Sequence, residues 1–128
     1  EICACLVGSE MCIRDSDCKT LDVNHILQRK KGTCSEYTNL FTALMRKKGI
    51  PCRFVAGFIF IPEQKFYGCH AWAECYLKQY GWMAVDPQSG KSWLPTTIIQ
   101  LFAGTDYTGC GLNSFMDLVP KSIEIVKE

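Results

Sequence analysis

The chain has 128 residues, of which 48% are hydrophobic and 21% charged, a composition typical of one globular domain with a sizeable core. A formal net charge of +1 gives no basis for a nucleic-acid partner, and the longest apolar run, 54–61, is too short for a membrane span. The nine cysteines lack the spacing of a disulfide framework or of zinc knuckles. We therefore expect mostly free thiols, no metal and no cofactor, and without a visible signal peptide a cytoplasmic location is favoured.

Residues 1–16 differ from the rest of the chain in their hydrophobic pattern. Residues 1–16 have no sustained hydrophobic period and resemble a translated adapter sequence, so we expect a non-native or disordered leader there. Residues 17–128 are expected to form one domain with a catalytic core over 21–87. Its first element would be a short amphipathic helix ending before Gly32, in which His25 is interpreted as a surface or half-buried residue.

A second helix is predicted to begin at Cys34. Thr33 and Glu36 have the spacing of a capping box, which puts Cys34 at the first helical position. Gly49 and Pro51 end the helix, and the apolar residues recurring at helical spacing are Tyr37, Leu40, Phe41, Leu44 and Met45. A thiol at a helix N-terminus meets backbone donors and the positive end of the dipole, which lower its pKa from ~8.5 toward neutrality. The pattern predicts an activated thiol, with chance placement of one of nine cysteines as the alternative.

Three strands are predicted next. Residues 53–61 indicate a largely buried strand in which Gly57 marks a bulge or a close backbone approach, and 62–68 is expected to be a polar loop. Residues 69–77 alternate, so the small side chains on one face (Cys69, Ala71, Ala73, Cys75) would let the Cys34 helix pack closely. After a turn at 78–81, residues 82–86 are expected to form an antiparallel third strand.

His70 and Asp86 fall on these last two strands. Their separation is even (86 − 70 = 16), so their side chains share a face if the hairpin loop has an odd number of residues. Cys34, His70 and Asp86 then supply a thiol nucleophile, a proton-transferring imidazole and a carboxylate that orients it. Taken singly, His70 has the alternative of a satisfied sheet histidine and Asp86 that of a turn residue. The backbone N–H of Cys34 is the predicted oxyanion donor.

The same residues resemble the transglutaminase-like superfamily of papain-fold cysteine enzymes. The similarity covers roughly 21–87 and lies in three ordered motifs: Gly32-Thr33-Cys34-Ser35-Glu36-Tyr37, His70-Ala71-Trp72-Ala73-Glu74 and Gly81-Trp82-Met83-Ala84-Val85-Asp86-Pro87. The resemblance implies an α+β fold with N-terminal helices packed on an antiparallel sheet, and a Cys34-His70-Asp86 triad. It is nearer to small prokaryotic protease-like and transglutaminase-like domains than to the large calcium-dependent enzymes. It also implies packing roles for Trp72 and Trp82 around the imidazole, and an ion pair between Arg53 and a carboxylate.

The predicted function is acyl transfer on peptide or glutamine-type amides through a thioester, with hydrolysis favoured and a protein or peptide as substrate. Cross-linking to an amine would use the same triad. An inactive scaffold, a thiol-disulfide protein and a metal-binding protein remain alternatives, although Cys69 and Cys75 are too far apart on one strand to bond. In the tail we expect a strand or short helix at 98–102, a loop at 104–111 containing Cys110, and an edge strand at 122–127.

Overall fold

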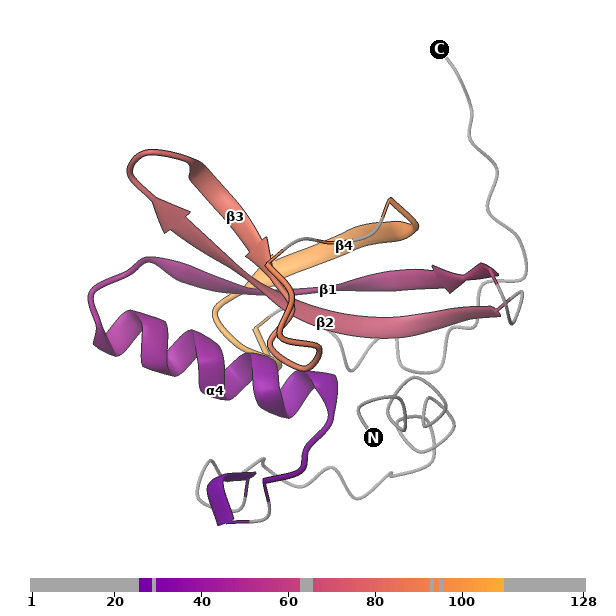
Figure 1. Cartoon of the computed structure of the whole chain (residues 1–128), viewed down its shortest axis with the longest axis horizontal. Helices are drawn as coiled ribbons and strands as arrows, with labels where there is room; N and C mark the ends of the chain where they lie inside the picture. The colour runs from indigo at the N-terminus through magenta and orange to yellow at the C-terminus, as the bar shows by residue number, and fades with distance from the viewer. Residues whose placement is uncertain (1–25, 29, 63–65, 93, 95, 110–128) are drawn as a thin grey trace.

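A computed structural model of the chain describes residues 26–28, 30–62, 66–92, 94 and 96–109. These residues contain the helix α4 (Cys34–Lys47) and the strands β1 (Cys52–Ile61), β2 (Phe66–Leu77), β3 (Gly81–Val85) and β4 (Ile98–Gly104). The strands form one antiparallel sheet in the order β3-β2-β1-β4, and α4 lies along one face of it (Figure 1). The predicted α+β arrangement of a helix on an antiparallel sheet is therefore confirmed.

Several predictions fall outside the described residues. These are the leader at 1–16, the first part of the helix that precedes Gly32, including His25, and the tail from Cys110 onward with its edge strand at 122–127. Of that first helix, Ile26–Gln28 are described and are helical, and Ile26 is buried.

The helix α4 begins where its capping box sets it. The Glu36 N–H donates to Thr33 Oγ1 at 3.3 Å, and the Thr33 N–H donates to Glu36 Oε2 at 2.6 Å. Two backbone donors that the helix cannot satisfy internally are thereby satisfied by side chains. At the other end Lys48 is the C-cap and Gly49 has a φ of +77°, a left-handed conformation that a residue without Cβ adopts without strain.

The face that α4 buries differs from the one its apolar residues predict. Its most buried side chains are Ser35, Thr38 and Thr42, whereas Leu44 is 51% exposed. The reason is the sheet beneath it, since Phe41 and Met45 flank a buried cluster of Cys52, Ala73 and Cys75. Small side chains on both surfaces bring the helix and the strands close together, and the larger Leu44 is left outside the interface. The small face predicted for β2 does receive this helix.

The strand β1 is one of the two interior strands of the sheet and lies between β2 and β4. Phe54, Val55 and Ala56 are each 0% exposed, as expected of a largely buried strand. Its pairing with β4 shifts register between Ala56 and Gly57, and a Cβ built on Gly57 would lie 1.9 Å from the Ile99 carbonyl oxygen. Gly57 is therefore required both by the bulge and by the close approach of β4, which confirms the prediction.

The strand β2 is longer than predicted and pairs with β3 through a short hairpin. It begins at Phe66, so part of the predicted 62–68 loop belongs to the β1–β2 ladder. The turn is three residues long, Lys78–Tyr80, followed by Gly81 with a φ of +75°. An odd loop is the condition under which His70 and Asp86 share a face. The region predicted as a strand or short helix at 98–102 is the strand β4, antiparallel to β1.

Candidate active site

Cys34 occupies the first position of α4, as the capping box predicts. Its side chain is partly buried and packs against the cluster of Phe54, Ala56 and Ala71, which belongs to β1 and β2. A second contact joins α4 to the turn that follows β4, because the backbone N–H of Tyr107 donates to Asn39 Oδ1 at 3.2 Å. The thiol is thus fixed between a helix N-terminus and the middle of the sheet.

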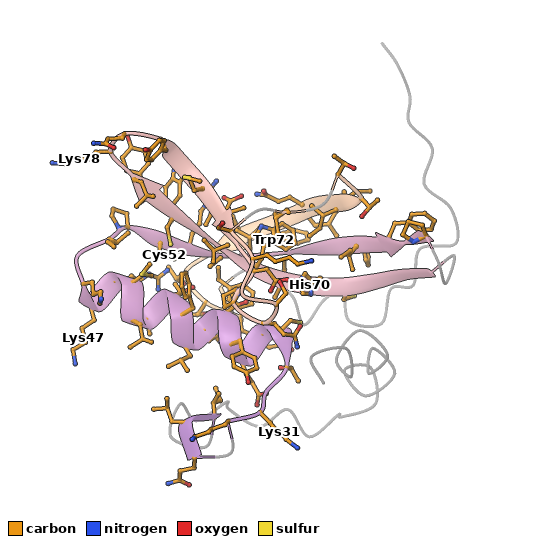
Figure 2. The ribbon with its side chains drawn as sticks, viewed as in Figure 1. Lys31, Lys47, Cys52, His70, Trp72 and Lys78 are labelled. Atoms are coloured by element: carbon orange, nitrogen blue, oxygen red, sulfur yellow. The ribbon has the colours of Figure 1, made fainter. Side chains whose placement is uncertain are left out.

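His70 lies on β2 (Figure 2), and it is opposite Gly57 of β1 and 8% exposed. The ring of Trp72, two residues along the same strand, stacks on the imidazole with a centroid separation of 6.4 Å and an interplanar angle of 24°. Trp72 is 1% exposed, so it shields one side of the imidazole from water. This agrees with the packing role that the resemblance implies for Trp72.

Asp86 follows β3 directly and forms a single bridge with Lys91 instead of continuing the ladder. The last paired residues of the β2–β3 ladder are Ala73 and Val85, so Asp86 stands diagonally across from His70. His70 Nε2 and Asp86 Oδ2 are 3.1 Å apart. The predicted pairing of these two residues is therefore present, in its diagonal form.

The second oxygen of the Asp86 carboxylate is held by the backbone of its own loop. Oδ1 accepts hydrogen bonds from the N–H groups of Gln88 at 3.0 Å and Ser89 at 3.3 Å. The loop is closed by two main-chain bonds, from the Asp86 N–H to the Lys91 carbonyl and from the Gly90 N–H to the Asp86 carbonyl. With Oδ1 fixed in this way, Oδ2 is directed at the imidazole. Sequence analysis missed this clamp, although an Asp-Pro pair followed by Ser and Gly is a turn signal that could have indicated it.

The electrostatics of His70 come from both of its neighbours. Burial by itself would lower the pKa of the imidazole, but hydrogen bonds with Asp86 and with Cys34, and the negative charges of both groups, raise the pKa of His70 to about 10. For Asp86, burial alone would raise the pKa, and the hydrogen bond from His70 overcomes it, so that the pKa lies below its ordinary value. The imidazole of His70 is therefore protonated at neutral pH and lies between Asp86 and Cys34.

The ring geometry distinguishes the two nitrogens of His70. Asp86 engages Nε2 of the imidazole, and the same ring also hydrogen-bonds with Cys34. A carboxylate on Nε2 favours the tautomer that carries a proton there. The structure thus brings together all three residues that the sequence singled out.

A second thiol, Cys69, lies next to His70 in the chain and differs from Cys34 in its environment. Burial first, and then the charge of nearby Cys34, raise the pKa of the Cys69 thiol above its ordinary value. The raised pKa keeps the Cys69 thiol protonated, whereas Cys34 has the His70 imidazolium as its neighbour. The two thiols provide an internal comparison within one site.

Trp82 does not belong to this site, and the packing role around the imidazole is wrong for it. The β2–β3 register pairs Trp82 with Tyr76, which is six residues, or about 20 Å, along β2 from His70. Trp82 is 46% exposed, its ring meets Tyr76 edge to face, and the Arg53 guanidinium lies 4.3 Å from its centroid. Arg53 itself makes the predicted ion pair, with Glu74 at 2.6 Å across the β1–β2 ladder.

Among the described residues, no three His, Cys, Asp or Glu side chains gather in a way that could hold a metal ion. In the same part of the chain, no helix combines the length and the apolar character needed to cross a membrane.

Comparison with known proteins identifies the family of the chain. Residues 6–87 match the model of the transglutaminase-like superfamily. The chain belongs to the transglutaminase-like superfamily. The match begins inside the 1–16 segment and ends one residue after Asp86, so it contains Cys34, His70 and Asp86.

Individual relatives within this cysteine-enzyme superfamily carry different names. The chain is 34% identical over 70 residues to a peptide-N(4)-(N-acetyl-beta-glucosaminyl)asparagine amidase from Oryza sativa subsp. japonica, covering 54% of this chain and 14% of the relative. It is 30% identical over 70 residues to a protein-glutamine gamma-glutamyltransferase from Pseudomonas aeruginosa, covering 48% of this chain and 10% of the relative. The chain thus spans a small fraction of the length of the curated relatives it matches.

One solved structure resembles the fold. It is a candidate cysteine protease from Cytophaga hutchinsonii, with a TM-score of 0.54 and 17% identity over 80% of this chain and 36% of that one. At this identity the likeness concerns the fold, and it supports the papain-like α+β core that the sequence predicted.

Proposed function

We propose that this transglutaminase-like domain catalyses acyl transfer from peptide or glutamine-type amides, with Cys34 as nucleophile, His70 as proton carrier and Asp86 as the residue that orients His70. The proposal rests on two contacts of the His70 imidazole. Its Nε2 lies 3.1 Å from Asp86 Oδ2, and the ring also makes a hydrogen bond with Cys34. A thiol attacks an amide carbonyl only as thiolate, and an adjacent imidazole supports that ionisation.

The proposed steps follow from these three positions. The Cys34 thiolate attacks the amide carbonyl, and the resulting oxyanion is stabilised by the backbone N–H of Cys34, at the positive end of α4. His70 then donates its proton to the leaving amine or ammonia, which leaves an acyl-thioester on Cys34. In the second half-reaction His70 removes a proton from the acceptor, which attacks the thioester and frees the enzyme.

The positions of Trp72 and Asp86 support the proton-transfer role of His70. Trp72 excludes water from one side of the imidazole, and the clamped carboxylate of Asp86 stabilises the imidazolium. We favour water as the acceptor, which makes the domain a hydrolase of the protease or amidase type. An amine acceptor, which gives cross-linking, uses the same residues, and the relative named protein-glutamine gamma-glutamyltransferase keeps it as the second candidate.

The first experiment measures thiol reactivity without assuming a substrate. Iodoacetamide alkylation of Cys34 and Cys69 is followed against pH by peptide mass spectrometry in the wild type, in His70→Ala and in His25→Ala, which changes the chain's other histidine. We expect Cys34 to react fast at neutral pH and Cys69 slowly, and only His70→Ala to slow Cys34 at neutral pH. Equal rates for the two cysteines, or no response to His70→Ala, would remove the basis of the proposal.

The second experiment separates hydrolysis from cross-linking. Glutamine-containing peptides are incubated with the protein with and without a primary amine, and ammonia release and amine incorporation are both measured. Ammonia or peptide-bond cleavage without amine identifies a hydrolase, and amine incorporation identifies an acyltransferase. Cys34→Ala should abolish either activity and Cys69→Ala should retain it.

A further inference from the structure

Two buried cysteines that the proposed reaction does not use lie side by side under α4. Cys52 on β1 and Cys75 on β2 are direct partners in the ladder, and their Sγ atoms are 3.1 Å apart. Cys52 is 6% exposed and Cys75 is 3% exposed. Figure 2 shows Cys52 between the sheet and the helix, where Phe41 and Met45 of α4 cover the pair. Both cysteines are free thiols in this structure.

The backbone at this pair has the geometry that a disulfide needs. The Tyr76 N–H donates to the Pro51 carbonyl at 2.8 Å, so Pro51 and Tyr76 form the hydrogen-bonded pair of the ladder. Hydrogen-bonded and non-hydrogen-bonded pairs alternate in antiparallel sheets, so the next pair, Cys52 and Cys75, is a non-hydrogen-bonded one. In such pairs the Cα atoms are ~4.5 Å apart, within the roughly 4.4–6.8 Å range that a disulfide bridges.

We propose that Cys52 and Cys75 form an intramolecular disulfide when the protein folds in the presence of a disulfide oxidant, cross-linking β1 to β2 beneath the helix that carries Cys34. With glutathione disulfide as oxidant, one cysteine thiolate attacks it to form a mixed disulfide and release one glutathione. The other cysteine thiolate attacks the protein sulfur of that mixed disulfide, forms the Cys52–Cys75 bond and releases the second glutathione. The two thiol protons are taken up by the two glutathione thiolates.

The environment of the pair determines when this reaction occurs. Burial, followed by the hydrogen bond with Cys52, raises the pKa of Cys75 to about 12, so the thiol stays protonated at neutral pH in the folded protein. The Cys52 thiol also contacts Thr42 Oγ1 at 3.9 Å under the helix. Since the thiolate is the reacting species and both thiols are covered, the bond forms during folding and only slowly afterwards. Once formed, it is protected from reductants by the same cover.

The test uses the full chain, unfolded and reduced, and then refolded either with a glutathione disulfide and glutathione mixture or with a non-thiol reductant. A non-reducing digest of the oxidised sample should contain the Cys52 peptide linked to the Cys75 peptide, at a mass lower by two hydrogens. The cross-link restricts the unfolded chain, so Tm should rise by on the order of 5–10 °C over the reduced sample. Folded, reduced protein given the same mixture should acquire the linkage far more slowly.

Variants separate this pair from the other cysteines. Cys75→Ala and Cys52→Ala should each abolish the difference in Tm between oxidised and reduced samples, and either one suffices if the other does not fold. Cys69→Ala, on the same strand and face as Cys75, is the matched control and should keep the difference. If the refolded wild type contains Cys52 and Cys75 as free thiols, or joined to other cysteines, the proposal is wrong, and the peptide map decides this without any variant.

Discussion

The charge state of His70 is the property on which the candidate site depends most directly, and Asp86→Asn perturbs it with the least change of shape. An amide oxygen in the Oδ1 position still accepts the hydrogen bonds from Gln88 and Ser89, so the loop keeps its conformation. The NH₂ group then replaces Oδ2 opposite His70 Nε2. A donor in place of a negatively charged acceptor disfavours the imidazolium and favours the tautomer with its proton on Nδ1.

The magnitude follows from the separation of the two groups. Unit charges 3.1 Å apart interact by about 1.3 kcal/mol at an effective dielectric constant of ~80 and by about 5 kcal/mol at ~20, or roughly one to four pKa units. The rise of the His70 pKa from its ordinary value of 6.5 to about 10, to which Cys34 also contributes, lies inside this range even after the opposing effect of burial. We expect Asp86→Asn to lower the pKa of His70 by at least about one unit.

The assay is an NMR titration of the imidazole carbon signals. The chain has two histidines, so a His25→Gln background leaves His70 as the single signal. Asp86→Asn is compared with this background, and Asp106→Asn is the matched control because it changes an exposed carboxylate outside the site. A background in which His70 titrates near 6.5, or an Asp86→Asn variant whose His70 pKa is unchanged, would refute the assigned electrostatics. The same substitution should slow acyl transfer by about 10²–10⁴-fold through the wrong tautomer.

Three further predictions concern stability. Gly57→Ala should lower the free energy of unfolding, measured by urea titration, by more than about 2 kcal/mol, because its Cβ would meet the Ile99 carbonyl oxygen at 1.9 Å. Gly49→Ala is the control: Gly49 has open space around it and a φ of +77°, so the loss should be about 1 kcal/mol. Equal losses for the two variants would contradict the close approach of Gly57 to β4. Thr33→Ala should cost about 1 kcal/mol and Thr33→Ser much less, since the hydroxyl caps α4, and circular dichroism melts that do not separate the two variants would count against the cap. The contribution of protonated His70 to the free energy of unfolding should be fully present below pH 6.5 and should be lost as pH rises toward about 10, because the raised His70 pKa means that the folded state binds a proton that the unfolded state has released. Asp86→Asn should flatten this dependence, and a wild-type stability that does not fall between these pH values would show that the imidazolium is not held.

Local sequence determined the parts of the site that depend on residues close together in the chain. The capping box places Cys34 at the start of α4 because Thr33 and Glu36 lie within one turn of each other. Alternation and a three-residue turn place His70 and Asp86 on one face of a hairpin, since both depend only on strand parity. The family resemblance joined these local signals into one predicted site.

Tertiary structure decided what depends on residues far apart in the chain. The sheet selected Ser35, Thr38 and Thr42 as the buried side of α4, because a surface of alanines and cysteines accepts small side chains more closely than leucines. The ladder register put Trp82 at the far end of the hairpin and Cys52 beside Cys75, pairings that no periodicity within a single strand encodes. Thus the sequence by itself determined which residues could carry the chemistry, through capping and parity. Packing between β1, β2 and α4 decided which of their neighbours surround them, because burial and register are properties of the assembled sheet.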